Sequence, residues 1–209
     1  MAETAPASVP EPASGPLASP LATIWNVPNA LTVGRLLLGL LVFGLIAVGQ
    51  YLGAAAVFGL AALTDALDGY LARLLKQETA LGRQLDPLVD KVIVAGSYIY
   101  LLAIPGTGVA AWMVTAIVIR ELLIQGLRSH LEGQGQAFGA RTAGKLKTVV
   151  QCLSITAILL GLTRTDLAWW VPVRDGLTWL AVFLTLYSGI GYVVNALPSL
   201  KRPVTDTNP

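Results

Sequence analysis

The chain has 209 residues, of which 55% are apolar and only 12% are charged, and its mean hydropathy is +0.67. Soluble domains carry about 25% charged residues, so the composition predicts an integral membrane protein with a single helical domain. The net charge of +2 points to no nucleic-acid partner. One cysteine excludes an intrachain disulfide, and one histidine argues against a His/Cys zinc site. Any metal would therefore need oxygen ligands, which suits a hard cation such as Mg²⁺.

The two ends of the sequence differ in composition from the rest. The first twenty residues are rich in Pro, Ala and Ser and contain neither Lys nor Arg. Such a composition is typical of a disordered tail. We therefore predict a tail over 1–22, a membrane domain over 23–199 and a second, cytoplasmic tail over 200–209.

Apolar segments long enough to cross a bilayer recur along the chain. They are too long and alternate too poorly for barrel strands, so helices are expected. The stretch "NVPNA" with Trp25 is interpreted as an interfacial, juxtamembrane lead-in, and "TRTDLAWWVPVRDG" (163–176) as the last connection. The fold class is thus all-α, with six transmembrane helices expected near 29–49, 54–75, 87–104, 108–129, 144–163 and 176–197.

Basic residues predict the orientation of these spans. They concentrate in the 2–3 connection, the 4–5 connection and the C-terminus, whereas the opposite side has only Arg164 and Arg174. By the positive-inside rule, both termini and the two basic connections are cytoplasmic. Trp169 and Trp170 are then expected in the outer aromatic belt.

Four aspartates lie within a short part of this apolar chain. Asp65 and Asp68 are three residues apart near the end of the second span, and Asp86 and Asp90 are four apart at the start of the third. Either spacing places both acids on one side of a helix, and a short hairpin brings the two pairs together. Close carboxylates repel one another, and divalent cations relieve that repulsion. The alternative is a set of surface acids neutralised by neighbouring basic residues, but intramembrane acids are more often functional.

Small residues accompany the acids. Gly69 and Ala72 share the face of Asp65 and leave room for a bulky ligand against the backbone. Arg73 lies just beyond them and can reach a phosphate group. Gly82 is expected to adopt a positive φ in the hairpin turn.

The pattern Asp65-x2-Asp68-Gly69-x2-Ala72-Arg73-x8-Gly82-x3-Asp86-x3-Asp90 resembles the complete signature of the CDP-alcohol phosphatidyltransferase family. The resemblance implies a six-helix, usually dimeric, membrane fold in which 23–199 is the catalytic domain. It implies that Asp65, Asp68, Asp86 and Asp90 bind two Mg²⁺ or Mn²⁺ ions and that Asp90 is also the general base. The implied CDP-lipid pocket contains Gly69, Ala72, Arg73 and Gly82. The donor would be CDP-diacylglycerol, and the enzyme would act at the cytoplasmic face of the bacterial cytoplasmic (inner) membrane.

The acceptor alcohol has to be inferred from basic residues outside this signature. A cationic pocket of Arg35, Arg120, Arg128, Lys145 and Lys147 favours an acceptor that carries a phosphate. Alternatively, the residues near span ends are ordinary positive-inside flanks, and Arg120 only pairs with Glu121.

Three segments extend the resemblance to one subfamily. "NVPNALTVGRLLL", "IRELLIQGLR" and "GKLKTVVQ" are similar to the corresponding stretches of the subfamily that uses sn-glycerol 3-phosphate and forms phosphatidylglycerophosphate. Other acceptors within the family (inositol phosphate, serine or phosphatidylglycerol) remain the alternative. A divalent-cation transporter or a silent scaffold is disfavoured, because the four acids lie at one side of the membrane.

Two polar residues at the start of the first span have open roles. Asn29 and Thr32 are one turn apart, and each either hydrogen-bonds a substrate hydroxyl or caps the helix. Capping is the preferred interpretation for Thr32. Asn29 is kept as a candidate for CDP-lipid binding. His130 is interpreted as a solvated loop residue.

Overall fold

The computed structural model describes residues 27–75, 80–133, 142–163 and 168–200, so the predicted tails 1–22 and 201–209 lie outside the described residues. Within these ranges, side chains are described except at 27–31, 65–75, 80–87, 132, 142–143, 145 and 198–200. The described part of the chain is all-helical. Its six helices are α1 (Val27–Ala47), α2 (Tyr51–Leu75), α3 (Ala80–Leu102), α4 (Ala111–Gly133), α5 (Thr142–Thr163) and α6 (Trp170–Leu200).

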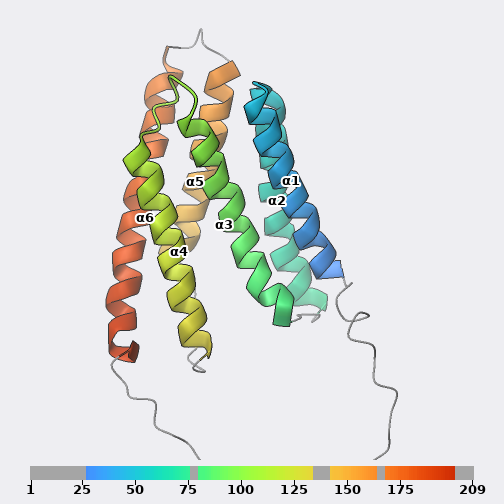
Figure 1. Ribbon diagram of the computed structural model, residues 1–209, viewed down its shortest axis with the longest axis vertical. Coiled ribbons are helices and arrows are strands. Elements are labelled where there is room, and N and C mark those ends of the chain that lie inside the picture. Colours follow the sequence, from blue (N-terminus) through green and yellow to red (C-terminus); the bar gives the residue numbers. More distant parts are fainter. Residues whose placement is uncertain (1–26, 76–79, 134–141, 164–167, 201–209) are drawn as a thin grey trace, which may run out of the picture.

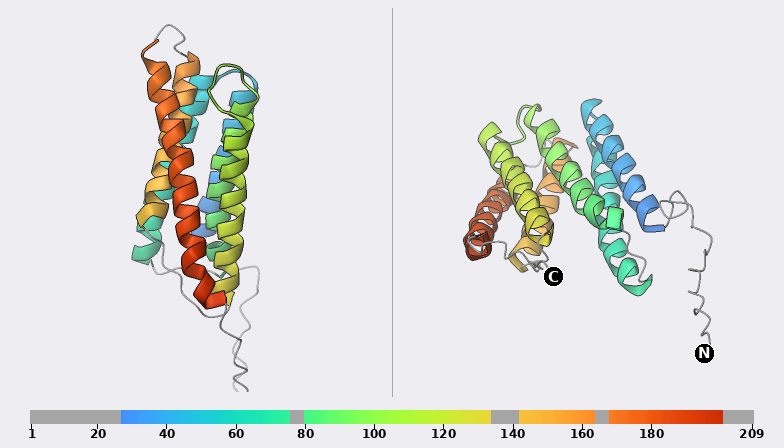
Figure 2. Two further views of the ribbon diagram at one scale, coloured as in Figure 1. Left: turned by 90° about the vertical axis from the view of Figure 1, so that its left-hand side faces the viewer. Right: turned by 60° about the horizontal axis from the view of Figure 1, so that its bottom comes forward.

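The helices run up and down in one bundle (Figure 1). α3 packs against α1, α4 and α5, while α5 packs against α2, α3 and α6. Figure 2 shows α6 running alongside α4, which it contacts. We call the end where α1 starts and α2 and α4 finish the basic end, and the other end the opposite end. Both described chain ends, Val27 and Leu200, lie at the basic end (Figure 1).

Several helix boundaries differ from the expected spans. α6 starts at Trp170, so the second half of the predicted connection 163–176 is helical. Pro172 is tolerated there because the first turn of a helix needs no hydrogen bond from its N–H groups. α3 starts at Ala80, seven residues before its expected start, and includes Pro87. Val27–Ala30 are continuous with α1 rather than a separate lead-in.

The apolar core lies between α1, α2, α3 and α5 and extends to α4 and α6. It includes the fully buried side chains of Phe58, Tyr98, Leu101 and Ile158. α1 and α3 approach closely at Gly39, because a Cβ built there would lie 2.6 Å from Cγ1 of Ile93. Small residues permit such close helix contacts within a membrane.

Hydrogen bonds between side chains join α5 to α6. Gln151 Nε2 donates to Thr185 Oγ1 at 3.0 Å, and the hydroxyls of Ser154 and Thr178 are 2.9 Å apart. All four residues are buried. Between membrane helices, such bonds supplement packing, because apolar burial contributes little to association in lipid.

The opposite end is closed by contacts between the α3–α4 loop and α6. Gly106 and Gly108 have positive φ values of 82° and 75°, which glycine adopts without steric cost. Arg174 Nη1 donates to the carbonyl oxygen of Gly106 at 2.6 Å, and its Nε donates to Asp175 Oδ1 at 2.8 Å. This contact set, which we call the Arg174 lock, fixes the loop against α6.

The surface of the bundle is strongly apolar. Exposed side chains on α6 include Trp179, Phe183, Tyr187 and Ile190. Among the described residues, Leu146–Thr163 and Trp170–Leu197 are long and apolar enough to cross a membrane, and Thr32–Ala47 and Tyr51–Thr64 form shorter apolar stretches. The aromatic pair at the opposite end differs in exposure: Trp169 is exposed, whereas Trp170 is half-buried and donates to Ala157 O.

Candidate active site

The backbone brings the four predicted acids to matching heights. Asp65 and Asp68 lie ten and seven residues before the end of α2, and Asp86 and Asp90 lie six and ten residues after the start of α3. At 1.5 Å per residue, both outer positions are about 15 Å from the hairpin connection, and both inner ones about 10 Å. The connection spans only 76–79. α2 and α3 therefore run in opposite directions from a short connection, as the hairpin prediction requires (Figure 1), and in the described part of the chain α2 packs on α1 and α5.

Most of the signature side chains lie outside the described set. These are Asp65, Asp68, Ala72, Arg73 and Asp86; for Gly69 and Gly82, which have no side chain, only the helical backbone is described. Gly82 lies within α3, so the prediction that it supplies a positive φ to the turn is wrong. Among the described side chains, no group of three His, Cys, Asp or Glu residues is placed to hold a metal ion. Of the predicted ligands, only Asp90 belongs to that set.

Asp90 is joined to the first helix by an ion pair. Arg35 Nη1 donates to Asp90 Oδ1 at 2.6 Å, and only 5% of the Arg35 side chain is exposed against 34% for Asp90. A buried guanidinium needs such a charged partner, because an unpaired ion is costly in apolar surroundings. Arg35, predicted to bind the acceptor phosphate, therefore lies beside the predicted base.

A second cluster of charges joins the middle of α4 to α5 and α6. Glu121, which is 4% exposed, accepts a short hydrogen bond from Lys147 Nζ and two longer ones, each 3.4 Å, from Arg120 Nη1. Arg120 Nη2 donates to Ser188 Oγ at 2.9 Å. We call Arg120, Glu121 and Lys147 the Glu121 cluster. It brings together two of the five residues predicted to bind the acceptor.

Arg120 is held only partly by this cluster. Its Nε is buried and has no hydrogen-bond partner in the described part of the chain. Gly189 of α6 lies directly beneath its side chain, since a Cβ there would be 2.9 Å from Arg120 Cγ. The guanidinium therefore has one buried N–H that no described group accepts.

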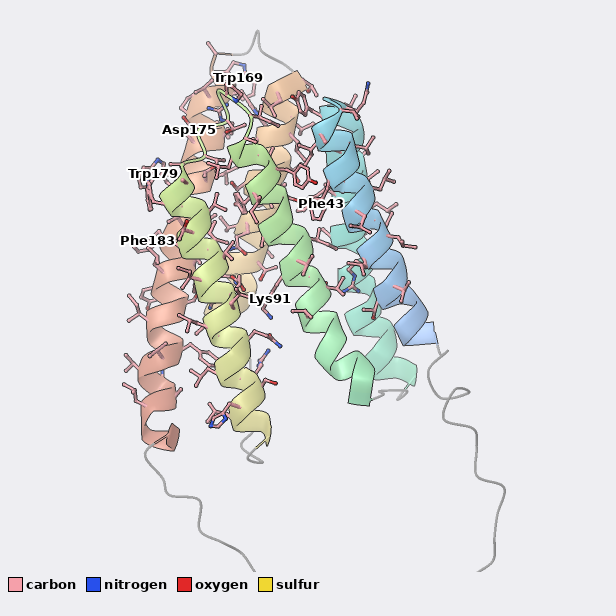
Figure 3. All side chains as sticks on the ribbon, viewed as in Figure 1. Phe43, Lys91, Trp169, Asp175, Trp179 and Phe183 are labelled. Carbon is pink, nitrogen blue, oxygen red and sulfur yellow. The ribbon has the colours of Figure 1, made fainter. Side chains whose placement is uncertain are left out.

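Lys91 of α3 contacts α4. It follows Asp90 on α3, and its Nζ donates a short hydrogen bond to Gln125 Oε1 of α4. Figure 3 shows Lys91 between α3 and α4. Neither Lys91 nor Gln125 is among the predicted site residues. Their contact joins positions 34 residues apart, which no spacing rule reveals.

The remaining predictions at this end have mixed outcomes. Arg128 lies two turns after Arg120 on α4, half-buried, whereas the side chains of Lys145 and Asn29 lie outside the described set. Thr32 is buried in the second turn of α1, so the capping interpretation is wrong, because a cap precedes the first helical residue. His130 is exposed but belongs to the last turn of α4 rather than to a loop.

Comparison with known proteins identifies the family of this chain. The family model for CDP-alcohol phosphatidyltransferases matches residues 25–187, and the chain belongs to this family, which is membrane-associated and generally dependent on a divalent metal. The chain is 35% identical over 193 residues to the CDP-diacylglycerol–glycerol-3-phosphate 3-phosphatidyltransferase of Bacillus subtilis (strain 168), covering 85% of this chain and 98% of that protein.

Two further relatives carry similar names. The Pseudomonas fluorescens protein named CDP-diacylglycerol–glycerol-3-phosphate 3-phosphatidyltransferase is 36% identical over 182 residues, covering 84% of this chain and 92% of the relative. The Arabidopsis thaliana chloroplastic/mitochondrial enzyme of that name is 32% identical over 180 residues, covering 79% of this chain and 60% of the relative. The matches thus include both the hairpin and the helices of the Glu121 cluster.

Proposed function

We propose that this protein transfers the phosphatidyl group of CDP-diacylglycerol to sn-glycerol 3-phosphate, giving phosphatidylglycerophosphate and CMP. The main support is the combination of relatives of that name, which the chain matches over most of their length, with cations within electrostatic range of Lys91, the residue after Asp90. A phosphorylated acceptor is a dianion near neutral pH, and buried Arg and Lys side chains are its usual partners.

The transfer joins the acceptor oxygen to one phosphorus atom. A free hydroxyl of glycerol 3-phosphate attacks the phosphorus that carries diacylglycerol, and the bond from that phosphorus to the oxygen that leaves with CMP breaks. The hydroxyl proton passes to Asp90, the proposed general base. Arg35 holds the Asp90 carboxylate from α1 at 2.6 Å and so orients it. Arg120, Arg128, Lys145 and Lys147 are proposed to bind the acceptor phosphate.

The hairpin is the proposed metal site. Asp65, Asp68, Asp86 and Asp90 supply only carboxylate oxygens, which suit Mg²⁺ or Mn²⁺, and their matched heights on α2 and α3 allow them to face one another. When bound, such cations neutralise pyrophosphate charge and stabilise the leaving CMP. Gly69, Ala72, Arg73, Gly82 and Asn29 are assigned to the CDP-lipid pocket.

All six helices are proposed to cross the bacterial cytoplasmic membrane, with the basic end in the cytoplasm. The support is the concentration of Lys and Arg at that end and the exposed apolar side chains along the bundle. This orientation places the proposed site at the cytoplasmic interface, where water-soluble glycerol 3-phosphate and a lipid donor both have access. A homodimer is proposed from the family resemblance.

The acceptor is tested with the purified full-length protein, Mg²⁺ or Mn²⁺ and CDP-diacylglycerol. We expect CMP release with glycerol 3-phosphate and much less with inositol phosphate, serine or phosphatidylglycerol. CMP release supported by one of these alternatives and not by glycerol 3-phosphate would show that the proposed acceptor is wrong.

The base is tested by Asp90→Asn. Loss of a general base typically lowers the rate by about 10²–10⁴-fold, so we expect turnover to fall at least a hundredfold while CDP-diacylglycerol still binds. Binding is measured separately by the thermal shift that CDP-diacylglycerol causes. Wild-type turnover in this variant would remove Asp90 from the proposed role.

A further inference from the structure

α6 presents buried polar side chains to α5. Thr178 and Thr185 are both buried and lie seven residues apart in α6, which is about two turns, so their side chains leave the same side of the helix. Thr178 is paired with Ser154 of α5, and Thr185 is paired with Gln151. Two hydrogen-bonded pairs of similar chemistry therefore join the same two helices at different heights.

The hydrogen bond between Gln151 and Thr185 has a defined direction. Thr185 Oγ1 donates to the carbonyl oxygen of Ala181 at 2.6 Å, and it accepts from Nε2 of Gln151 at 3.0 Å. A hydrogen bond weakens steeply when its distance or angle changes, whereas apolar contacts have no such directionality. The bond therefore fixes the position of α5 along α6.

On α5, this bond lies one turn from Lys147. Lys147 and Gln151 are four residues apart, so their side chains lie on the same side of the helix. The ammonium group of Lys147 is bound to Glu121 of α4. A shift of α5 along its axis would therefore move Lys147 together with Gln151 and would change the contact between Lys147 and Glu121.

On α6, the same bond lies one turn from the contacts of Arg120. Ser188 lies three residues after Thr185 and accepts from Arg120 Nη2 at 2.9 Å. Gly189 follows directly and lies against the Arg120 side chain. α6 runs between α4 and α5 and packs against both (Figure 2). The position of α5 on α6 therefore sets where Lys147 lies relative to Arg120.

We propose that Gln151 and Thr185 are positioning residues for the acceptor site, and that their hydrogen bond keeps Lys147 and Arg120 in the arrangement that binds the phosphate. This inference rests on the proposed function, in which both cations bind the acceptor. Gln151 and Thr185 are 1% and 0% exposed, so each acts through the helix that carries it. Loss of the bond should weaken acceptor binding and leave the binding of CDP-diacylglycerol unchanged.

The test uses Thr185→Val in the full-length protein, since valine keeps the branched shape and lacks the hydroxyl. From the contribution of hydrogen bonds between membrane helices, the apparent KM for glycerol 3-phosphate should rise by roughly three- to tenfold. The KM for CDP-diacylglycerol should stay the same. Thr185→Ser keeps the hydroxyl and should keep the wild-type KM. Gln151→Met removes the same bond from α5, so it should cause the same rise, and the double variant should cause no further rise.

Thr178→Val is the matched control. It breaks the pair of Ser154 with Thr178, which joins the same two helices, so the melting temperature should fall about as much as in Thr185→Val. Thr178 lies ten residues before Ser188, about 15 Å along the helix axis. The acceptor KM of this variant should therefore equal that of the wild type.

Melting temperatures in detergent and both KM values are measured for every variant, and Gln151→Met decides if Thr185→Val does not fold. The same rise of the acceptor KM in Thr185→Val and Thr178→Val would show a general loosening of α5 on α6 and would overturn the inference. An unchanged acceptor KM in Thr185→Val and Gln151→Met, with a wild type that uses glycerol 3-phosphate, would overturn the inference alone. If the wild type used serine and not glycerol 3-phosphate, the proposed function would fail as well.

Discussion

Two arginines, each largely shielded from solvent and each followed in the chain by an acid, lie in different halves of the bundle and are held in different ways. In the Arg174 lock, Nη1 bonds to Gly106 O, while Nε and Nη2 both contact Asp175 Oδ1. In the Glu121 cluster, Arg120 bonds to Ser188 at 2.9 Å and to Glu121 only at 3.4 Å. Its Nε has no partner among the described residues.

This difference separates a structural arginine from one available to a ligand. All three nitrogens of Arg174 are used within the protein, so its contribution is to fix the α3–α4 loop. Arg120 has an unused donor and shares its acid with Lys147, so its local charge is not balanced. Figure 3 shows the same division, with Asp175 at the opposite end and Lys91 in the half nearer the basic end. An arginine followed by an acid therefore fixes a loop in one place, and in the other it is the arginine that we propose to bind the acceptor.

The largest effect is expected from Arg120→Ala. A hydrogen bond from a charged group to the acceptor stabilises binding by about 1.5–3 kcal/mol. Its loss should therefore raise the apparent KM for glycerol 3-phosphate at least tenfold. The KM for CDP-diacylglycerol should stay within twofold. Steady-state CMP release at varied concentrations of each substrate measures both values. Equal increases in the two KM values would show that Arg120 does not act on the acceptor specifically, and would contradict the distinction between Arg120 and Arg174.

Arg174→Ala is expected to act on stability instead. It leaves the Gly106 carbonyl and Asp175 without their partner, at a cost of about 1–3 kcal/mol, and each kcal/mol shifts the melting temperature by roughly 2–4 °C in a chain of this size. Thermal unfolding in detergent should show this decrease, with substrate KM values unchanged. Val173→Ala, at an exposed neighbouring position, is the control. A raised acceptor KM without a stability change would assign Arg174 to the site.

Gly189→Ala should have the smallest effect, because it displaces the Arg120 side chain only slightly. The new Cβ would meet Arg120 Cγ at 2.9 Å, and an off-rotamer side chain costs about 0.5–1.5 kcal/mol. We expect a roughly two- to tenfold rise in the acceptor KM. Gly191→Ala is the matched control, because no atom lies within 4 Å of its added Cβ. The same change in both variants would show that the effect comes from helix propensity rather than from Arg120.

Much of the fold could be predicted from local signals. Apolar runs predicted the helices, and the spacing from Asp65 to Asp90 predicted the hairpin, because both depend on residues close in sequence. The start of α6 could not be predicted, since the polar stretch 163–176 reads as a connection although its second half, with Pro172 in the first turn, is helical. Hydropathy also placed the start of α3 at Pro87, seven residues late.

Among the described residues of the candidate site, only contacts between residues close in sequence could be predicted. Arg120 and Glu121 are adjacent, and their pairing was one of the two interpretations weighed. The ion pair of Lys147 with Glu121 joins residues 26 apart, and that of Arg35 with Asp90 joins residues 55 apart. Such contacts depend on which helices become neighbours, and the periodicity of a single helix contains no such information. The contact of Lys91 with Gln125 could not be predicted for the same reason.

The most direct measurement is the fate of a labelled acceptor. The purified protein is incubated with a divalent cation, CDP-diacylglycerol and either ¹⁴C-glycerol 3-phosphate or ¹⁴C-glycerol, and the label in the lipid phase is compared with the CMP released. We predict that label from glycerol 3-phosphate enters lipid in equal amount to CMP, and that label from glycerol does not. CMP release without labelled lipid, or equal incorporation of glycerol, would contradict a transferase that recognises the acceptor by its phosphate.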